Sequence, residues 1–281
     1  MSDAHCDPAV TDCYAVMGNP IAHSKSPLIH RLFAEQTGQK LCYEALLVGL
    51  DNFAQAVAAF LIKGGKGLNV TVPFKQEAWK IADELSGRAQ RAGAVNTLAM
   101  GDQGALYGDN TDGAGLVRDL TRNLGIVVQG KRLLILGAGG AARGVLAPLL
   151  EQQPTAVHIA NRTAERAAEL AATFGDLGEL SAGGLGDIPK QRYELIINAT
   201  ATGLQDKVPT LPTGIIHADS CCYDLMYAAE PTAFMRYAIA QGSQCSFDGL
   251  GMLVEQAAES FRLWRGVNPD TAPVITALRN A

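Results

Sequence analysis

The feature that most constrains the fold of this chain is an apolar segment followed directly by a glycine-rich turn. Residues 133–136 form a near-continuous apolar run, which is typical of a strand buried on both faces of a parallel sheet. The turn reads Gly137-Ala138-Gly139-Gly140-Ala141-Ala142 and opens a predicted helix. Gly137 permits a tight turn, Gly139 lets backbone amides approach a pyrophosphate, and the small Ala142 allows the helix to pack closely on the strand. The pattern predicts a doubly wound, Rossmann-type α/β unit that binds a dinucleotide. A glycine-rich turn without a ligand is the alternative.

The end of the next predicted strand indicates which dinucleotide binds. A NAD site places an Asp or Glu there, about 20 residues after the glycines, where it contacts the ribose hydroxyls. This chain has Asn161-Arg162-Thr163, with Arg166 one turn further and no acid in residues 160–163. A guanidinium pairs with a phosphate through two parallel hydrogen bonds, so this corner favours the 2′-phosphate of NADP. The alternative is that Arg162 is only a solvated residue at a helix start.

The first half of the chain alternates strand and helix patterns. A glycine-rich turn at 101–104 then separates two further strands, as in a hairpin. Parallel β–α–β units followed by a hairpin predict a mixed sheet. The predicted strands are 14–17, 41–48, 67–72, 96–100 and 105–108, and the predicted helices run from Pro27 to Gly38 with Ser26 as N-cap, from Asp51 to about Ile62, and from Pro73 onward.

The second half predicts a doubly wound domain and a helical tail. The predicted strands are 131–136, 156–160, 194–199 and 218–223, and the predicted helices include 163–174, 231–241 and a first one from Thr111 to about Leu124. From Leu250, an apolar stripe at helical spacing predicts an amphipathic helix that needs a surface to cover, and we expect it to return to the first domain. We therefore expect two α/β domains. The substrate-binding, catalytic domain comprises residues 1–112 and 250–281, and the NADP-binding domain comprises residues 113–249.

Composition and charge exclude several classes of protein. The 281 residues are 48% hydrophobic and 18% charged, which predicts a compact globular fold rather than disorder. A net charge of −5 offers no basic surface to nucleic acid or to an anionic membrane. The six cysteines lack metal-ligand spacing, so we expect reduced thiols and no metal site. The N-terminal segment is acidic where a signal peptide is basic, and no apolar run approaches the ~18 residues of a membrane span, so we expect a cytoplasmic protein.

Polar residues in the first predicted domain gather where strands end. They are Ser24, Ser26, Asn69, Thr71, Lys75, Asn96 and Asp112. Together they offer hydroxyls, amides, a cation and a carboxylate, which suits a small polyhydroxylated acid as ligand. Each residue alone also has an ordinary structural interpretation, such as a helix cap for Ser26 or a surface lysine with a buried stem for Lys75.

Short motifs with specific spacing are spread over nearly the whole chain. In order, they are Gly18-Asn19-Pro20, His23-Ser24-Lys25-Ser26-Pro27, residues 69–75, 93–97, 108–113, 137–142, 161–163, 198–200, 223–227 and 248–256. This series resembles the shikimate dehydrogenase family. The resemblance implies a two-domain oxidoreductase that reversibly reduces 3-dehydroshikimate to shikimate with NADP, in the shikimate pathway of aromatic amino acid (chorismate) biosynthesis.

The resemblance also implies roles for individual residues. Lys75 and Asp112 match the catalytic pair. The implied substrate contacts are Ser24 and Ser26 on the carboxylate, and Asn69, Thr71, Lys75, Asn96, Asp112, Tyr227 and Gln256 around the hydroxyls. The implied NADP contacts are Gly137, Ala138, Gly139, Gly140 and Ala141 on the pyrophosphate, Asn161, Arg162, Thr163 and Arg166 on the adenosine phosphate, and Leu225 and Gly249 near the nicotinamide. Two positions depart from the family pattern: Gly87, where an acid sometimes occurs, and Leu225, where methionine is common.

Other functions stay open beside this one. Reduction of a ring ketone needs a proton donor, and a lysine ammonium is suited to that task. The main alternative is a broad-specificity quinate/shikimate dehydrogenase that uses NAD or NADP; the arginine corner favours NADP, and nothing excludes quinate. A non-catalytic paralogue that binds NADP or a metabolite is more remote, because Lys75 and Asp112 are both present. A folate-linked dehydrogenase would not explain Ser24 and Ser26 together with Gln256. The oligomeric state stays open, with a homodimer as one option.

Overall fold

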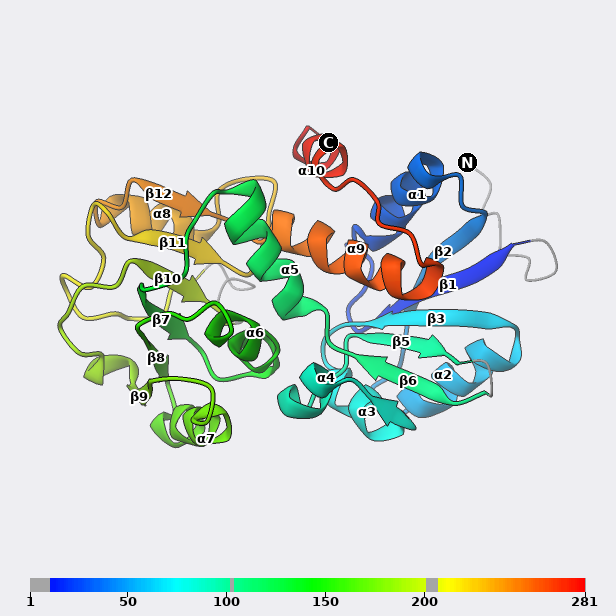
Figure 1. The fold of residues 1–281 in the computed structure, drawn as a ribbon, viewed down its shortest axis with the longest axis horizontal. Helices are drawn as coiled ribbons and strands as arrows, with labels where there is room; N and C mark the ends of the chain where they lie inside the picture. The colour runs from blue at the N-terminus through cyan, green and yellow to red at the C-terminus, as the bar shows by residue number, and fades with distance from the viewer. Residues whose placement is uncertain (1–10, 102–103, 201–206, 281) are drawn as a thin grey trace. The chain divides into compact units, whose positions relative to one another are not determined.

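The chain folds into two compact α/β units (Figure 1). A computed structural model describes residues 11–101, 104–200 and 207–280. Unit 1 comprises the residues up to Thr111 together with those from Val254 onward, and unit 2 comprises Asp112–Leu253. The C-terminal tail therefore belongs to the same unit as the N-terminal half, as the sequence predicts.

Unit 1 contains a mixed sheet. Its strands are β1 (Asp12–Gly18), β2 (Leu41–Leu47), β3 (Gly65–Val70), β4 (Glu84–Leu85), β5 (Thr97–Met100) and β6 (Leu106–Asp109), in the order β2-β1-β3-β5-β6-β4. Strand β1 pairs in parallel with β2 and β3, whereas β3–β5 and β5–β6 are antiparallel. The predicted mixed sheet and its hairpin are confirmed; Asp102 and Gln103 of the hairpin turn lie outside the described residues.

Helices cover both faces of this sheet (Figure 1). They are α1 (Ser26–Thr37), α2 (Phe53–Ile62), α3 (Lys75–Ile81), α4 (Gly87–Ala92), the part of α9 (Leu250–Arg265) from Val254 onward, and α10 (Ala272–Arg279). Successive strand side chains point to opposite faces, and β1 follows that rule. Ala15 and Met17 pack into a core with Phe53 of α2, whereas Tyr14 stacks on Trp264 of α9 with ring centroids 4.7 Å apart. Because α9 lies on the sheet through such contacts, its apolar stripe has the surface that the sequence requires.

Unit 2 is a doubly wound parallel sheet. Its strands are β7 (Arg132–Leu136), β8 (Ala156–Asn161), β9 (Leu180–Gly184), β10 (Leu195–Asn198), β11 (Cys221–Asp224) and β12 (Cys245–Phe247), in the order β12-β11-β10-β7-β8-β9 with every pairing parallel. Leu133 and Ile135 enter one core, and Leu134 and Leu136 enter the other, which is why the sequence shows a continuous apolar run there. The helical segments are α5 (Asp112–Arg118), the π-helix Asp119–Asn123, α6 (Gly140–Leu150), α7 (Ala164–Phe174), the 3₁₀ turn Leu185–Asp187 and α8 (Ala233–Ala240).

Three local expectations differ from the structure. The helix predicted from Thr111 to Leu124 changes to a π-helix at Asp119, whose buried carboxylate accepts a hydrogen bond from Tyr223. Ser26 is not the N-cap of α1; Lys25 holds that position, and the Ser26 hydroxyl forms a hydrogen bond with Tyr43 instead. Cys13, Cys221, Cys222 and Cys245 form no disulfide bond, but Cys42 is disulfide-bonded, so the expectation of reduced thiols is wrong there. Sequence spacing does not reveal which thiols folding brings together.

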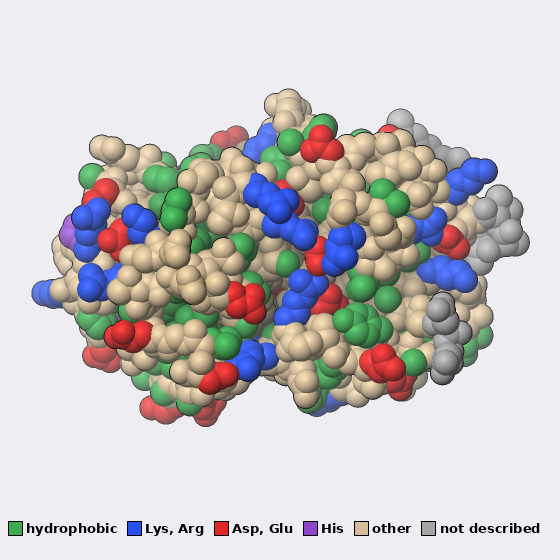
Figure 2. Space-filling model, viewed as in Figure 1, with side chains coloured by type: hydrophobic (Ala, Val, Ile, Leu, Met, Phe, Trp, Pro, Cys, Tyr) green, Lys and Arg blue, Asp and Glu red, His purple; other side chains and the backbone are tan. Residues whose placement is uncertain are grey.

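Two further features of the described residues are the distribution of charged side chains on the surface and the length and hydrophobicity of the helices. On the face that Figure 2 presents, acidic and basic side chains are interspersed. Within residues 11–101, 104–200 and 207–280, no helix is both long and apolar enough to cross a membrane.

A buried histidine lies among the aromatic rings between α1, α9 and the sheet of unit 1. His30 is 0% exposed, and its ring stacks on Tyr43 with centroids 4.1 Å apart. Phe261 and Trp264 of α9 lie at 6.1 and 5.4 Å. Burial removes water from the charged form and lowers the pKa of His30 to about 3. His30 is therefore neutral in the folded protein at neutral pH.

We expect this burial to make unit 1 less stable in mild acid. Between the ordinary histidine pKa of 6.5 and the folded value of about 3, the unfolded chain binds a proton that the folded chain excludes, so stability falls as the pH decreases through that window. Between pH 7 and pH 4, His30 should lower the free energy of unfolding by about 3 kcal/mol, and the His30→Phe variant should not show this decrease.

Urea unfolding followed by tryptophan fluorescence measures the effect, because both tryptophans, Trp79 and Trp264, lie in unit 1. His217→Gln, at an exposed histidine of unit 2, is the control. Parallel pH profiles for wild type and His30→Phe would contradict the assignment.

Candidate active site

The glycine loop of unit 2 adopts a backbone that requires glycine at its first position. Gly137 follows β7 with φ +106°, and its amide donates to the carbonyl oxygen of Ala160 at 2.7 Å. A Cβ at residue 137 would lie 3.0 Å from the carbonyl oxygen of Ala199. A Cβ on Gly139 or Gly140 would meet no atom within 4 Å, so the outer side of the loop is open at the start of α6. Ala138 is buried and Ala141 half-buried beneath this open side.

The order of the strands places this loop at a binding position. Read from β9, the order β9-β8-β7-β10-β11-β12 reverses direction between β7 and β10. In open α/β sheets, ligands bind outside the carboxyl ends of the strands at such a reversal. The close approach of Gly137 to Ala199 joins the ends of β7 and β10 there.

The end of β8 presents the predicted arginine corner. Asn161 ends the strand, and its side-chain amide donates to the carbonyl oxygen of Thr163 at 2.9 Å. Thr163 is the N-cap residue of α7, and the amide of Arg166 donates to its carbonyl oxygen at 3.2 Å. Arg162, Thr163 and Arg166 are exposed, so two guanidinium groups are available one helical turn apart.

The end of β11 is fixed by a buried carboxylate that the sequence analysis did not single out. Asp224 accepts hydrogen bonds from Asn198 at 3.0 Å, from the Met226 amide at 3.2 Å and from Thr232 at 2.7 Å. Burial raises the pKa of Asp224, and these hydrogen bonds oppose the rise. Asp224 belongs to the motif at 223–227, and the signal for its role is a lone acid at the end of an apolar strand.

Leu225, Tyr227 and Gly249 lie beside Asp224. Leu225 and Tyr227 are half-buried, and the Gly249 amide donates to the carbonyl oxygen of Met226 at 2.9 Å. A Cβ on Gly249 would overlap the carbonyl group of Leu225, which explains the need for glycine. The structure thus brings Leu225 and Gly249 together.

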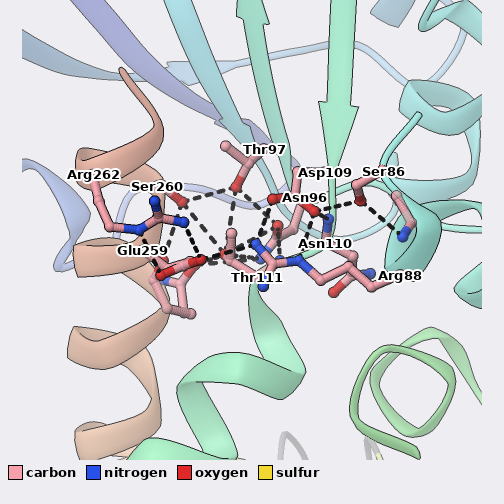
Figure 3. A network of polar contacts seen from close by, with 12 residues as sticks. Ser86, Arg88, Asn96, Thr97, Asp109, Asn110, Thr111, Glu259, Ser260 and Arg262 are labelled. Atoms are coloured by element: carbon pink, nitrogen blue, oxygen red, sulfur yellow. Dashed lines mark hydrogen bonds and ion pairs between the residues drawn. The ribbon is translucent and has the colours of Figure 1, made fainter. Parts of the chain in front are cut away.

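Unit 1 builds a buried network of amides and hydroxyls around Asn96 (Figure 3). Asn96 is 2% exposed, and its Nδ2 donates to Gln256 Oε1 at 3.3 Å and to Thr111 Oγ1 at 2.9 Å. Its Oδ1 accepts the Thr111 amide at 2.8 Å. The Thr111 hydroxyl also donates to Gln256 Oε1, at 3.3 Å, which fixes the orientation of the Gln256 carboxamide.

Asn69 joins the same network from β3. Its Nδ2 lies within hydrogen-bond distance of Thr97 Oγ1 at 3.1 Å and Ser260 Oγ at 3.0 Å, and its Oδ1 accepts from the Tyr43 hydroxyl at 2.7 Å. The hydroxyls of Thr97, Thr111 and Ser260 were missed at the sequence level. Ser260 had a readable signal, because it lies four residues after Gln256 on the same side of α9.

Ser24, Ser26 and Thr71 lie just after the carboxyl ends of β1 and β3. These strands are parallel neighbours, and the Asn19 amide donates to the carbonyl oxygen of Val72 at 3.0 Å, which ties the two loops together. Ser24 and Ser26 follow β1, with the Ser26 amide 3.3 Å from Ser24 Oγ, and Thr71 follows β3.

Lys75 and Asp112 begin helices. Lys75 is half-buried at the first position of α3, and its carbonyl oxygen accepts the Val95 amide at 2.8 Å, next to Asn96 in sequence. Asp112 is buried at the first position of α5 in unit 2, directly after Thr111. The residues implied as a catalytic pair therefore come from different units.

Comparisons with known proteins bear directly on these two units. Family models described as the shikimate dehydrogenase substrate binding domain, shikimate/quinate 5-dehydrogenase and the shikimate 5′-dehydrogenase C-terminal domain match residues 16–98, 119–206 and 249–279. A shikimate dehydrogenase (NADP(+)) of Thioalkalivibrio sulfidiphilus is 58% identical over 95% of this chain and 98% of its own length. The chain belongs to the shikimate dehydrogenase family.

Solved structures agree with this membership. The crystal structure of an Ael1 enzyme from Pseudomonas putida is 44% identical with a TM-score of 0.89, over 95% of this chain and 98% of its own. Shikimate 5-dehydrogenase from Thermus thermophilus, in complex with NADP(H) and shikimate, is 36% identical with a TM-score of 0.84, over 96% and 98% of the two chains. The two-domain fold implied by the motifs is confirmed.

Among the described residues, no three His, Cys, Asp or Glu side chains gather in a group that could hold a metal ion.

Substituting Gly137→Ala tests the requirement for glycine in the loop. A non-glycine residue at φ +106°, with its Cβ 3.0 Å from Ala199, should strain the loop by about 1–3 kcal/mol. We expect NADPH to bind about tenfold more weakly, since about 1.4 kcal/mol corresponds to that factor. Fluorescence titration with NADPH measures it.

Gly186→Ala is the matched control, because a Cβ at this exposed residue of unit 2 meets no atom within 4 Å. Equal NADPH affinities for Gly137→Ala and Gly186→Ala would contradict the account of the loop.

Proposed function

We propose that this chain catalyses the reversible, NADP-dependent reduction of 3-dehydroshikimate to shikimate, with Lys75 and Asp112 as its catalytic residues. The observation that carries the proposal is the network in unit 1, where the amides of Asn96 and Gln256 are fixed in orientation beside the segment that presents Lys75. Fixed amides suit the recognition of ring hydroxyls at defined positions. Relatives named shikimate dehydrogenase support the choice of substrate.

The residues of unit 2 fit NADP. The open side of Gly139 and Gly140 leaves room for a pyrophosphate against backbone amides at the start of α6. Asn161, Thr163 and the exposed guanidinium groups of Arg162 and Arg166 would hold the 2′-phosphate and its ribose. Gly137, Ala138 and Ala141 shape the pyrophosphate loop, and Leu225 and Gly249 would lie against the nicotinamide. When bound, NADPH supplies the hydride for the reduction.

The residues of unit 1 would bind the hydroxy acid. Ser24, in the loop after β1, and Ser26, at the first position of α1, would contact the carboxylate. The implied contacts to the ring hydroxyls are Asn69, Thr71, Asn96 and Gln256, with Tyr227 and Asp112 contributed by unit 2. Apart from Tyr227, the implied substrate contacts fall in residues 1–112 and 250–281, which we propose as the substrate domain, and the implied cofactor contacts fall in residues 113–249.

Lys75 would move the proton. Its ammonium would donate a proton to the oxygen that the reduction converts from ketone to alcohol, and the neutral amine that remains would accept the proton in the reverse direction. Asp112 would hold the ammonium and a substrate hydroxyl in place through its carboxylate. No other step is needed for the conversion, because one hydride and one proton complete it.

A turnover assay tests the proposal. Absorbance of the reduced nicotinamide is followed with shikimate and with quinate, each offered with NADP and with NAD. We expect fast turnover with shikimate and NADP. We also expect Lys75→Ala to lower kcat by about 10²–10⁴-fold, the range for loss of a general acid–base group.

Lys63→Ala is the matched control, since Lys63 is an exposed lysine of the same unit. Comparable rates with quinate or NAD would assign the chain to a broad-specificity branch of the family. Absence of turnover despite NADPH binding would contradict the proposed function and favour a non-catalytic paralogue.

A further inference from the structure

An ion network with two buried carboxylates lies next to the amides of unit 1 (Figure 3). Asp109 ends β6, and its side chain is 5% exposed. It accepts two hydrogen bonds from Arg88, from Nε at 2.7 Å and from Nη2 at 2.5 Å. The Ser86 hydroxyl at 2.5 Å and the Asn110 amide at 2.7 Å complete its shell. Burial raises the pKa of Asp109, but its bonds with Arg88 outweigh burial and lower it, so Asp109 stays ionised.

Arg88 also reaches the C-terminal helix. Its Nη2 lies 3.2 Å from Oε1 of Glu259, a residue of α9 whose side chain is 4% exposed. Arg262 donates to both carboxylate oxygens of Glu259, from Nε at 3.2 Å and from Nη2 at 2.8 Å. The network therefore holds two cations and two carboxylates, and Arg88 is the member that joins the sheet to α9.

Each residue whose carboxylate contacts Arg88 is also connected to a residue with a proposed substrate-binding side chain. The backbone carbonyl oxygen of Asp109 accepts a hydrogen bond from the backbone N–H of Asn96 at 3.0 Å. Glu259 lies three residues after Gln256, on neighbouring positions of the same helix. The side-chain Nδ2 of Asn96 donates to Oε1 of Gln256 at 3.3 Å. Arg88 thus links the residue that holds the backbone of Asn96 to the helical turn that carries Gln256.

We propose that Arg88 is a positioning residue for substrate binding, which holds Asn96 and Gln256 at the spacing that fits the ring hydroxyls by joining Asp109 to Glu259. This inference rests on the proposed function, since it names what sets the geometry of that same site. Arg88 is suited to the task because its planar guanidinium engages Asp109 through two nitrogens while also reaching Glu259. A lysine ammonium keeps the charge but cannot form the paired contact.

The test compares Arg88→Met and Arg88→Lys with wild type. For Arg88→Met we expect the KM for shikimate to rise about tenfold, since misplacing binding groups by around 1 Å can cost up to about 10²-fold. The KM for NADP should stay within about twofold, because the network and the NADP residues belong to different units. Arg88→Lys should bring the KM for shikimate part of the way back to the wild-type value. A role in folding alone would not change the KM for shikimate while leaving the KM for NADP unchanged.

Arg265→Met is the matched control. Arg265, on α9, is like Arg88 a partly buried arginine of unit 1. It contacts Asp12 and Gln39 and takes no part in the network of Asp109 and Glu259. We expect this variant to lose stability in the tryptophan-fluorescence unfolding assay while the KM for shikimate stays unchanged. If Arg88→Met fails to fold, Glu259→Gln takes its place, with an expected rise in the KM for shikimate of about threefold.

The outcomes separate the inference from the proposed function. Wild type that neither turns over nor binds shikimate, as measured by calorimetry, would overturn both. Normal wild-type turnover with an unchanged KM for shikimate in the Arg88 and Glu259 variants would overturn the inference alone. Equal changes in both KM values and in kcat, shared by Arg265→Met, would show a general structural role and would also overturn it.

Discussion

The fold of unit 1 and its proposed chemistry depend on one buried residue, Asn96. Its backbone accepts from Val70 of β3 and donates to Asp109 of β6, while its side chain engages Thr111 and Gln256. A buried amide that satisfies its hydrogen bonds is rigid, because each lost bond leaves a polar group unpaired away from water. The same bonds that stabilise the hairpin therefore hold the amides in the orientation for binding hydroxyls.

In unit 2, the backbone rather than the side chains fixes the geometry of the proposed binding site. The left-handed Gly137 and the close contact of Gly249 with Leu225 bring the strand ends together without side-chain bulk. Asp224 fixes the end of β11 through neighbours on β10 and at the start of α8. The unit offers exposed amides and arginines on a fixed frame, which is what a dinucleotide requires.

Local patterns made much of this predictable from the sequence. The buried strand at 133–136, the glycine loop and the arginine corner are contiguous, so periodicity and spacing suffice to identify them. The Arg88 network could not be predicted, because Arg88 lies 21 residues from Asp109 and 171 from Glu259. Strands β4 and β12, with two and three residues, are too short to give a pattern. Ser26 failed as a predicted cap because a tertiary partner, Tyr43, takes its hydroxyl.

The central claim is that the binding amides are in place before substrate arrives. A pair of crystal structures, of the chain alone and of its complex with shikimate and NADP, tests it most directly. We predict that shikimate contacts Ser24 and Ser26 through its carboxylate, and Asn96 and Gln256 through a ring hydroxyl. We also predict that the hydrogen bonds that orient the two amides, from the Thr111 backbone amide to Asn96 Oδ1 and from the Thr111 hydroxyl to Gln256 Oε1, are present in both structures. Shikimate bound away from these amides, or amides that reorient on binding, would contradict it.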